Sequence, residues 1–221
     1  MLLALETATD VCSVAFCDND GDLFEKRIEK RGAHSEQLFL FIAELMEEHD
    51  FRITELSALL VSEGPGSYTG LRIGASAVKG LLFQTEVPLY GVNTLASFAV
   101  GSVDDASPAG TIHAIIDARR VHVYHQQFHV SGTALAAGSE VEVLPIDRFE
   151  SMVASGDLIT GTGLNRISED IKAKTVTRGP GAITARSLVK LYRHGYEAFF
   201  HPASPPAFEP KYYTSNQVNG G

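Results

Sequence analysis

The sequence predicts an α/β protein built on a mixed sheet. Three short runs of apolar and β-branched residues come first, and the apolar spacing then changes from the period of a strand to that of a helix. A strand, a glycine-rich loop, a helix and another strand follow in that order. A meander followed by a βαβ unit gives a sheet that contains both antiparallel and parallel neighbours.

The elements of the first half follow from local patterns. The Asp18–Asp22 turn separates two strands of the meander, and Leu38, Phe41, Ile42 and Leu45 mark one helical face. The predicted elements are strands at 2–7, 12–17 and 23–28, a helix at 35–49, a strand at 59–61, a helix at 71–83 and a strand at 88–92.

The second half repeats a shortened alternation of strands and helices. A stretch rich in Ser, Asp, Pro and Gly at 102–110 predicts a lobe boundary. Beyond it we predict a hairpin of strands at 111–117 and 121–130, strands at 141–144 and 158–160, and helices at 148–154 and 182–194. The chain therefore divides into a first lobe at 1–101, a smaller second lobe at 102–201 and an extended tail at 202–221.

Length and composition fit one body of two lobes. The chain has 221 residues, of which 44% are hydrophobic and 20% charged, which is an ordinary globular composition. Its 18 Lys and Arg against 27 Asp and Glu give a formal charge of −9. A field of that sign repels phosphate backbones, so we do not expect this chain to bind nucleic acid by itself.

The N-terminus and the cysteines predict a reduced, cytoplasmic chain. Met1–Glu6 has no basic region, so we expect no signal peptide, and the uncharged stretch at 87–103 is too polar and too short for a membrane span. Cys12 and Cys17 lie in one strand-like run, on opposite faces and about 16 Å apart at about 3.3 Å per residue. They cannot bridge each other.

The glycine loop is the first candidate for chemistry. Backbone N–H groups before a helix form a natural anion site, and Gly64, Gly66 and Gly70 precede the second predicted helix. A phosphate-binding P-loop needs Gly-Lys-Ser/Thr at its end, whereas Gly70 is followed by Leu71 and Arg72. A tight turn between strand and helix also explains the glycines, and the residues alone favour this interpretation over an anion site.

Histidine and carboxylate residues give weaker candidates. On a strand, His122 and His125 face opposite sides, while His125 and His129 are roughly 13 Å apart, so no single metal ion fits them. His34 has no second histidine one turn on, which leaves zinc hydrolase chemistry unsupported. Glu6 ends the first strand and Asp117 lies at the hairpin turn, where each can serve either a magnesium ion or the local turn.

The first two helices predict either a large internal core or a protein partner. Residues 38–46 are apolar around most of two turns, and a helix of that kind must be covered on nearly every side. The next helix carries Gly70, Gly74 and Gly80, each at a propensity cost of about 1 kcal/mol, which suggests a need for close packing. A sheet covers only one side of each helix, so we favour a partner.

Five stretches of the sequence together form a specific pattern. The longest, Ser62–Gly74, reads Ser-Glu-Gly-Pro-Gly-Ser-Tyr-Thr-Gly-Leu-Arg-Ile-Gly, and the others are Leu3–Thr9, His34–Glu36, Ile116–Arg120 and Pro210-x-Tyr212. They resemble the TsaB family of bacterial tRNA modification proteins, also called YeaZ, whose hallmark is Gly-Pro-Gly-Ser-Phe/Tyr-Thr-Gly-Leu-Arg-Ile-Gly. The next three stretches agree with the family in order and spacing, and the last resembles the family's tail. The match runs from end to end of the chain.

This resemblance implies an actin-like ASKHA fold of two ribonuclease H-like lobes. It also implies a non-catalytic partner of TsaD, the subunit that transfers a threonylcarbamoyl group to N6 of the adenosine 3′ of the anticodon, in tRNAs reading codons that begin with A. The ATPase TsaE would join the complex, ADP or ATP would bind at the subunit interface if at all, and tRNA would be contacted mainly through the complex. No metal is expected.

The resemblance also assigns residues to two sites. The two helices would form the partner interface through Leu38, Phe41, Ile42, Leu45, Gly70, Leu71, Gly74, Ala77 and Val78. A nucleotide-binding or purely structural loop would comprise Glu6, Thr7, Gly64, Gly66, Ser67 and Asp117.

Three alternatives stay open. The same helices could form a homodimer, and the chain could instead be a peptidase-like glycoprotease or a free-standing ASKHA kinase. The kinase would need Glu6, the glycine loop and Asp117 to bind Mg-ATP. Val121 and His122 replace a more usual Gly-Glu in the hairpin, and Tyr213-Thr214 replaces Leu-Arg in the tail, so we assign these side chains no role.

Overall fold

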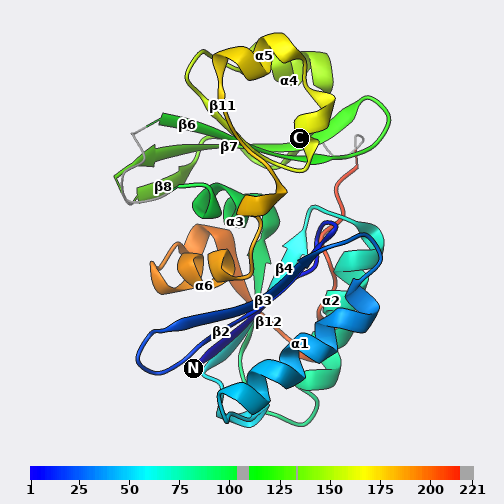
Figure 1. Cartoon of the computed structure of the whole chain (residues 1–221), viewed down its shortest axis with the longest axis vertical. Coiled ribbons are helices and arrows are strands. Elements are labelled where there is room, and N and C mark those ends of the chain that lie inside the picture. The colour runs from blue at the N-terminus through cyan, green and yellow to red at the C-terminus, as the bar shows by residue number, and fades with distance from the viewer. Residues whose placement is uncertain (104–109, 133, 215–221) are drawn as a thin grey trace. The chain divides into compact units, whose positions relative to one another are not determined.

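The computed structural model describes residues 1–103, 110–132 and 134–214. The chain forms two compact units (Figure 1), one from residues 1–97 with 184–211 and the other from residues 98–183 with 212–221. Each unit contains a six-stranded sheet with both parallel and antiparallel neighbours. The α/β class and the two mixed sheets flanked by helices are confirmed.

The first sheet joins an antiparallel meander to parallel strands. It runs in the order β12-β5-β4-β1-β2-β3. β1 pairs antiparallel with β2 and parallel with β4, which in turn pairs parallel with β5. The strands are β1 (Leu2–Glu6), β2 (Val11–Cys17), β3 (Leu23–Glu29), β4 (Ala58–Gly64), β5 (Leu89–Asn93) and β12 (Phe200–Ala203).

Helices cover both faces of this sheet. α1 (His34–Glu48) packs on β2 and β3, and α2 (Tyr68–Leu81) packs on β4. α6 (Arg186–Arg193) contacts β1, β2 and β4 and lies on the other face (Figure 1). Because these strands are covered on both sides, every residue of β1, β2 and β4 is buried, which explains their nearly continuous apolar sequence.

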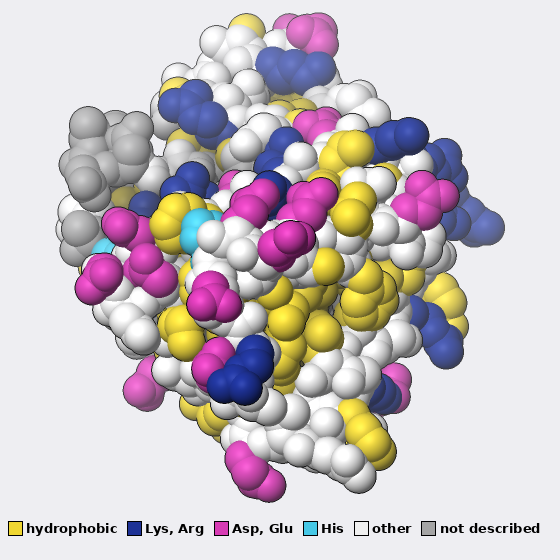
Figure 2. Space-filling view, turned by 60° about the horizontal axis from the view of Figure 1, so that its bottom comes forward, with side chains coloured by type: hydrophobic (Ala, Val, Ile, Leu, Met, Phe, Trp, Pro, Cys, Tyr) yellow, Lys and Arg dark blue, Asp and Glu magenta, His cyan; other side chains and the backbone are white. Residues whose placement is uncertain are grey.

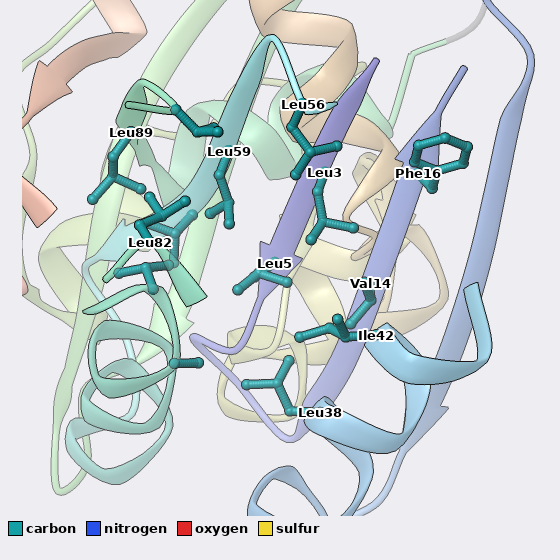
Figure 3. Packing of buried hydrophobic residues seen from close by; sticks show 14 of the residues in the cluster. Leu3, Leu5, Val14, Phe16, Leu38, Ile42, Leu56, Leu59, Leu82 and Leu89 are labelled. Atoms are coloured by element: carbon teal, nitrogen blue, oxygen red, sulfur yellow. The ribbon is translucent and has the colours of Figure 1, made fainter. Parts of the chain in front are cut away.

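The core of the first unit lies between this sheet and the two long helices. Figure 3 shows Leu3 and Leu5 of β1 on the same side of the sheet as Leu38 and Ile42 of α1. Leu3, Leu5 and Leu38 are 0% exposed and Ile42 is 2% exposed, so this face of α1 is fully used inside the chain.

The second sheet follows the same plan around one long hairpin, β6 and β7. β6 pairs antiparallel with β7 and parallel with β10, in the order β11-β10-β6-β7-β8, and β9 also pairs with β7. Phe149 of α4 packs against Ile115 and Ile159 in a separate small core. The strands are β6 (Gly110–Asp117), β7 (His122–Ser131), β8 (Ala134–Ala137), β9 (Glu142–Pro145), β10 (Leu158–Gly161) and β11 (Val176–Arg178), and the helices are α4 (Ile146–Met152) and α5 (Glu169–Lys174).

The unit boundaries differ from those predicted. Residues 184–201 belong with the first unit, because α6 packs on its sheet and β12 pairs antiparallel with β5. Residues 202–211 also belong to it, so they are not a separate tail, and residues 215–221 lie outside the described residues. Part of the predicted boundary at 102–110 falls at residues 104–109, which are likewise not described.

Five strands and helices were missed from the sequence, namely α3 (Thr94–Gly101), β8, α5, β11 and the four-residue β12. α3 contains Leu95, Ala96 and Phe98, each 0% exposed, and a helix buried all round shows no amphipathic period. β8, α5 and β11 have four, six and three residues, which is too short for a periodic signal. In the described part of the chain, no helix combines the length and apolarity needed to cross a membrane.

Candidate functional site

The glycine loop between β4 and α2 packs against the turn between β1 and β2. A Cβ atom added at Gly66 would collide with the carbonyl oxygen of Ala8, and one added at Gly70 would collide with that of Thr7. A Cβ atom at Gly74 would lie 2.5 Å from Thr7 Oγ1. These three glycines therefore allow the loop and α2 to pack closely against Thr7 and Ala8. This agrees with the interpretation of the loop as a tight turn between strand and helix.

Three N–H groups of this loop donate to groups of the same chain. Ser67 N donates to Ala8 O at 2.6 Å, Gly70 N donates to Ser67 Oγ at 3.4 Å, and Gly64 N donates to Thr94 Oγ1 at 3.0 Å. The carbonyl oxygen of Lys211 fills the space where a Gly64 side chain would lie. A nucleotide phosphate needs free donors and an open cradle, and the N–H groups of Gly64, Ser67 and Gly70 do not provide them.

Glu6 and Thr7 lie beside the loop and are fully buried. Glu6 Oε1 accepts from Ala8 N at 2.7 Å, and Thr7 N donates to Ser62 Oγ at 3.2 Å. Burial raises the pKa of Glu6 from 4.5 to about 7, against the bonds from Ala8 and Ser62. In the described residues, Glu6 Oε2 and Thr7 Oγ1 have no hydrogen-bond partner. The structure thus places Glu6 and Thr7 next to the glycine loop.

Asp117 lies in the second unit and holds a turn. Its Oδ1 accepts from Arg119 N at 2.8 Å and from Arg166 Nη1 at 2.7 Å. These contacts account for the carboxylate as a turn residue, the second of the two roles that the sequence left open.

His34 also has a structural contact. Its ring Nε2 lies 3.1 Å from Val11 O and links the start of α1 to β2. The ring is 5% exposed. Over the described ranges, no three His, Cys, Asp or Glu side chains group closely enough to hold a metal ion.

A buried chain of polar residues in the second unit was missed from the sequence. His113 Nε2 lies 3.1 Å from Asp157 Oδ2, and His113 Nδ1 lies 3.0 Å from His125 Nε2. Since Asp157 accepts, His113 must donate from Nε2 and accept at Nδ1 from His125. His113 is opposite Gln127 in the β6–β7 register, two positions from His125. Diagonal pairs of this kind can be found only once the register is known.

The predicted interface residues of the two helices are mostly core residues of this chain. The exposed fractions are 0% for Leu38, 2% for Ile42 and 1% for Leu45, and these side chains face the chain's own sheet. In α2, the structure buries Gly70, Leu71, Gly74, Ala77 and Val78. Only Phe41 of the set is partly exposed. The other eight are buried within this chain, because the apolar period marks the side that faces the sheet, and their assignment to a partner interface stays a prediction.

The outward sides of the same helices present a different set of residues. We define the α1/α2 surface as Phe39, Leu40 and Ala43 of α1 with Ile73, Ser76 and Gly80 of α2. Phe39 is 51% exposed and Leu40 is 48% exposed. Figure 2 shows hydrophobic side chains gathered on the side of the molecule where α1 and α2 lie.

Gly80 differs from the other glycines of α2. A Cβ atom added there would meet nothing within 4 Å, and its φ is not left-handed. A glycine inside a helix costs up to about 1 kcal/mol relative to alanine. Packing within the chain gives no reason for that cost.

Fold comparison places the chain in one structural class. YeaZ from Pseudomonas aeruginosa is 24% identical, with a TM-score of 0.80 over 96% of this chain and 99% of that chain. The family model described as "TsaD: tRNA N6-adenosine threonylcarbamoyltransferase" matches residues 29–157. The class is that of α/β proteins with two mixed-sheet units, and the chain is related to the threonylcarbamoyltransferases that this family model describes.

Sequence relatives define the family within that class. The chain is 32% identical to the tRNA threonylcarbamoyladenosine biosynthesis protein TsaB of Escherichia coli (strain K12) over 166 residues, which cover 73% of this chain and 71% of that protein. It is also 32% identical to TsaB of Haemophilus influenzae over 57% of this chain and 52% of that protein. The chain belongs to the TsaB family.

Proposed function

We propose that this chain is a non-catalytic subunit that pairs with a TsaD-type threonylcarbamoyltransferase through its α1/α2 surface. Membership of the TsaB family supports a role in forming threonylcarbamoyladenosine in tRNA. The pairing is inferred from the surface itself, and the observation that carries it is the open space at Gly80 of α2, with Phe39 and Leu40 exposed on α1.

The α1/α2 surface has the properties of a helix-packing interface. Phe39 and Leu40 expose apolar area, and Gly80 leaves the backbone of α2 open to close approach. A residue without a side chain favours helix contact because it lets two backbones come near. The cost of Gly80 in the free chain is explained if a second chain packs there.

The internal engagement of the candidate catalytic groups supports a non-catalytic role. The glycine loop packs against Thr7 and Ala8. His34 contacts Val11 O, and Asp117 forms an ion pair with Arg166. The glycoprotease and kinase alternatives would need some of these groups free for substrate. We therefore retain the partner hypothesis as the better supported one.

Further partners follow from the same proposal. TsaE would join the paired subunits, and tRNA would be bound mainly by the complex. ADP or ATP would need residues of the second subunit, because the glycine loop has no free cradle. A homodimer of the free chain would use the same apolar surface and would compete with pairing.

The test compares two variants at one position. Gly80→Leu should block close packing, whereas Gly80→Ala adds one methyl group and improves helix propensity. Size-exclusion chromatography with light scattering, with and without the cognate TsaD-type protein, should show a mixed species with the wild-type chain. We expect Gly80→Leu to weaken that species at least tenfold while the variant remains folded by circular dichroism.

Two outcomes would contradict the proposal. A folded Gly80→Leu variant and a folded Leu40→Glu variant that both pair normally would remove α1 and α2 from the interface. Threonylcarbamoyl transfer to tRNA by this chain alone, in a reconstituted assay with purified components, would contradict the non-catalytic role. A lower mass of the free chain in Gly80→Leu than in the wild type would reveal a homodimer on the same surface.

A further inference from the structure

The tip of the β6–β7 hairpin holds two arginines in an unfavourable backbone conformation. Arg119 has φ of 68° and Arg120 has φ of 51°, both in the left-handed region. A side chain there costs roughly 1 to 2 kcal/mol per residue, and glycine or asparagine would fit with less strain. Two consecutive arginines at such positions need a reason beyond the turn.

The turn is fixed by hydrogen bonds from several elements. Asp117 Oδ1 accepts from Arg119 N, and the guanidinium of Arg166 donates both to Asp117 and to the carbonyl oxygen of Arg120. Ile146 N, at the start of α4, donates to Val121 O at 2.9 Å. The tip is therefore held in one conformation, and its strain is balanced by these bonds.

The charges at the tip do not cancel. Arg166 is paired with Asp117, which leaves the guanidinium groups of Arg119 and Arg120 exposed, and within the described chain neither one forms an ion pair. Asp147, next to Ile146 in sequence, accepts from Arg148 N. The chain as a whole carries −9, but screening over about 8 Å at physiological salt limits the reach of distant carboxylates. The tip is a local positive point on an acidic protein.

We propose that this hairpin tip binds the phosphodiester backbone of the RNA substrate. A guanidinium fork matches two phosphate oxygens, and a rigid tip presents two such forks without further ordering. An acidic protein partner fits less well, because a stable protein interface needs about 800 Å² per partner with an apolar centre, and the tip exposes one apolar side chain, Val121. This inference rests on the proposed role in tRNA modification.

The contact is consistent with weak binding by the free chain. Two phosphate contacts give weak but measurable binding by the free chain against a net charge of −9, and the affinity rises once another component also holds the RNA. The tip would then position the RNA rather than read its sequence.

The decisive variants replace each arginine by asparagine. Asparagine tolerates the left-handed region, so Arg119→Asn and Arg120→Asn should raise the melting temperature by about 2 to 4 °C each. The same variants should weaken RNA binding on the order of tenfold together. A purely structural role for these arginines would not separate stability from binding in this way. Arg178→Asn, at an exposed arginine on β11, is the matched control and should change neither quantity.

Binding is measured by fluorescence anisotropy with a labelled tRNA transcript and the full chain alone, across low salt concentrations. The slope of log affinity against log salt should fall by about 0.9 for each phosphate that the variant no longer neutralises. No wild-type binding at low salt, or equal binding by the folded double variant, would overturn the proposal. A loss of ADP binding with RNA binding unchanged would also overturn it, in favour of a nucleotide phosphate. The titration needs no TsaD-type protein, so its failure is distinct from a failure of pairing.

Discussion

A fall in pH should destabilise the second unit and stabilise the first. The second unit contains the buried chain Asp157–His113–His125, with the His125 ring against Phe149. The first unit contains the buried carboxyl of Glu6. The perturbation is acidification from about pH 7 to about pH 5, where both groups change their balance between folded and unfolded states.

The histidines oppose acid because the folded state keeps them neutral. Burial, with a smaller contribution from His113, lowers the pKa of His125 from 6.5 to about 3. Burial also lowers the pKa of His113, although the hydrogen bond that His113 donates to Asp157 acts in the opposite direction. Below pH 6.5, His125 binds a proton in the unfolded chain but stays neutral in the folded chain. Each pH unit below 6.5 lowers the free energy of unfolding of the second unit by about 1.36 kcal/mol. At pH 5, which is about 1.5 units lower, the loss is about 2 kcal/mol. His113 acts in the same direction.

Glu6 has the opposite sign. Its pKa is raised by burial from 4.5 to about 7, so the folded state holds a proton that the unfolded state has lost. The cost is fully present above about pH 7 and is relieved as the pH falls towards 4.5. Between pH 7 and pH 5 this relief is about 2 kcal/mol in favour of the first unit. Global unfolding would show little net change, because the two effects nearly cancel.

Segment-resolved hydrogen exchange can separate the two units. After correction for intrinsic rates, the free energy of opening for amides of β6 and β7 should fall by about 2 kcal/mol on acidification. Amides of β1 and β4 should become better protected. His125→Gln keeps a donor to His113 but cannot ionise, so its second unit should lose most of the acid sensitivity. Glu6→Gln should do the same for the first unit.

Two results would refute this pH dependence. Equal acid responses of the β6–β7 and β1–β4 amides would show that the buried groups do not control the units separately. A His125→Gln variant as acid-sensitive as the wild-type chain would remove the histidine chain as the cause.

Three other outcomes can be checked by denaturant or thermal unfolding. Gly74→Leu should destabilise the free chain by about 1 to 3 kcal/mol, since its side chain would overlap Thr7, and a stable variant would contradict the packing of the glycine loop. Gly80→Ala should instead stabilise the free chain by up to about 1 kcal/mol, and a destabilised variant would show that the helix needs glycine there. Glu63→Gln should cost about 1 kcal/mol and expose residues near Lys211 to proteolysis, since Glu63 Oε1 accepts from Lys211 Nζ at 2.8 Å; unchanged cleavage would show that this pair does not anchor the segment.

Much of the fold could be predicted from local patterns. The meander and the βαβ unit follow from strand period, turn residues and glycine, and each predicted strand of the first half has its counterpart. The return of residues 184–211 to the first unit could not be predicted, because it depends on the pairing of β12 with β5. A strand of four residues, at Phe200–Ala203, gives no sign of its distant neighbour.

The site was predicted less well than the fold, for a physical reason. Periodicity identified Leu38, Ile42 and Leu45 as a face that must be buried, but it does not say what buries it. The chain's own sheet does so. Positions on the outward side of α1, such as Leu40, do not belong to the periodic apolar face, so periodicity does not identify them. The open space at Gly80 can be recognised only from the three-dimensional structure. The grouping of Glu6 and Thr7 with the glycine loop came from the family resemblance, and their role stays a prediction.

The glycines of α2 show how one composition can serve two purposes. Thr7 of the same chain occupies the space where side chains at Gly70 and Gly74 would lie. The helix-propensity cost of these two glycines is therefore offset by the close packing of Thr7, directly after β1, against α2. Gly80 faces open space on the same helix, and no contact within the described chain offsets its cost. The difference argues for an external contact at one end of α2 and an internal one at the other. Only the external contact can be disturbed without first disturbing the fold, which makes Gly80, rather than Gly74, the position at which pairing is properly tested.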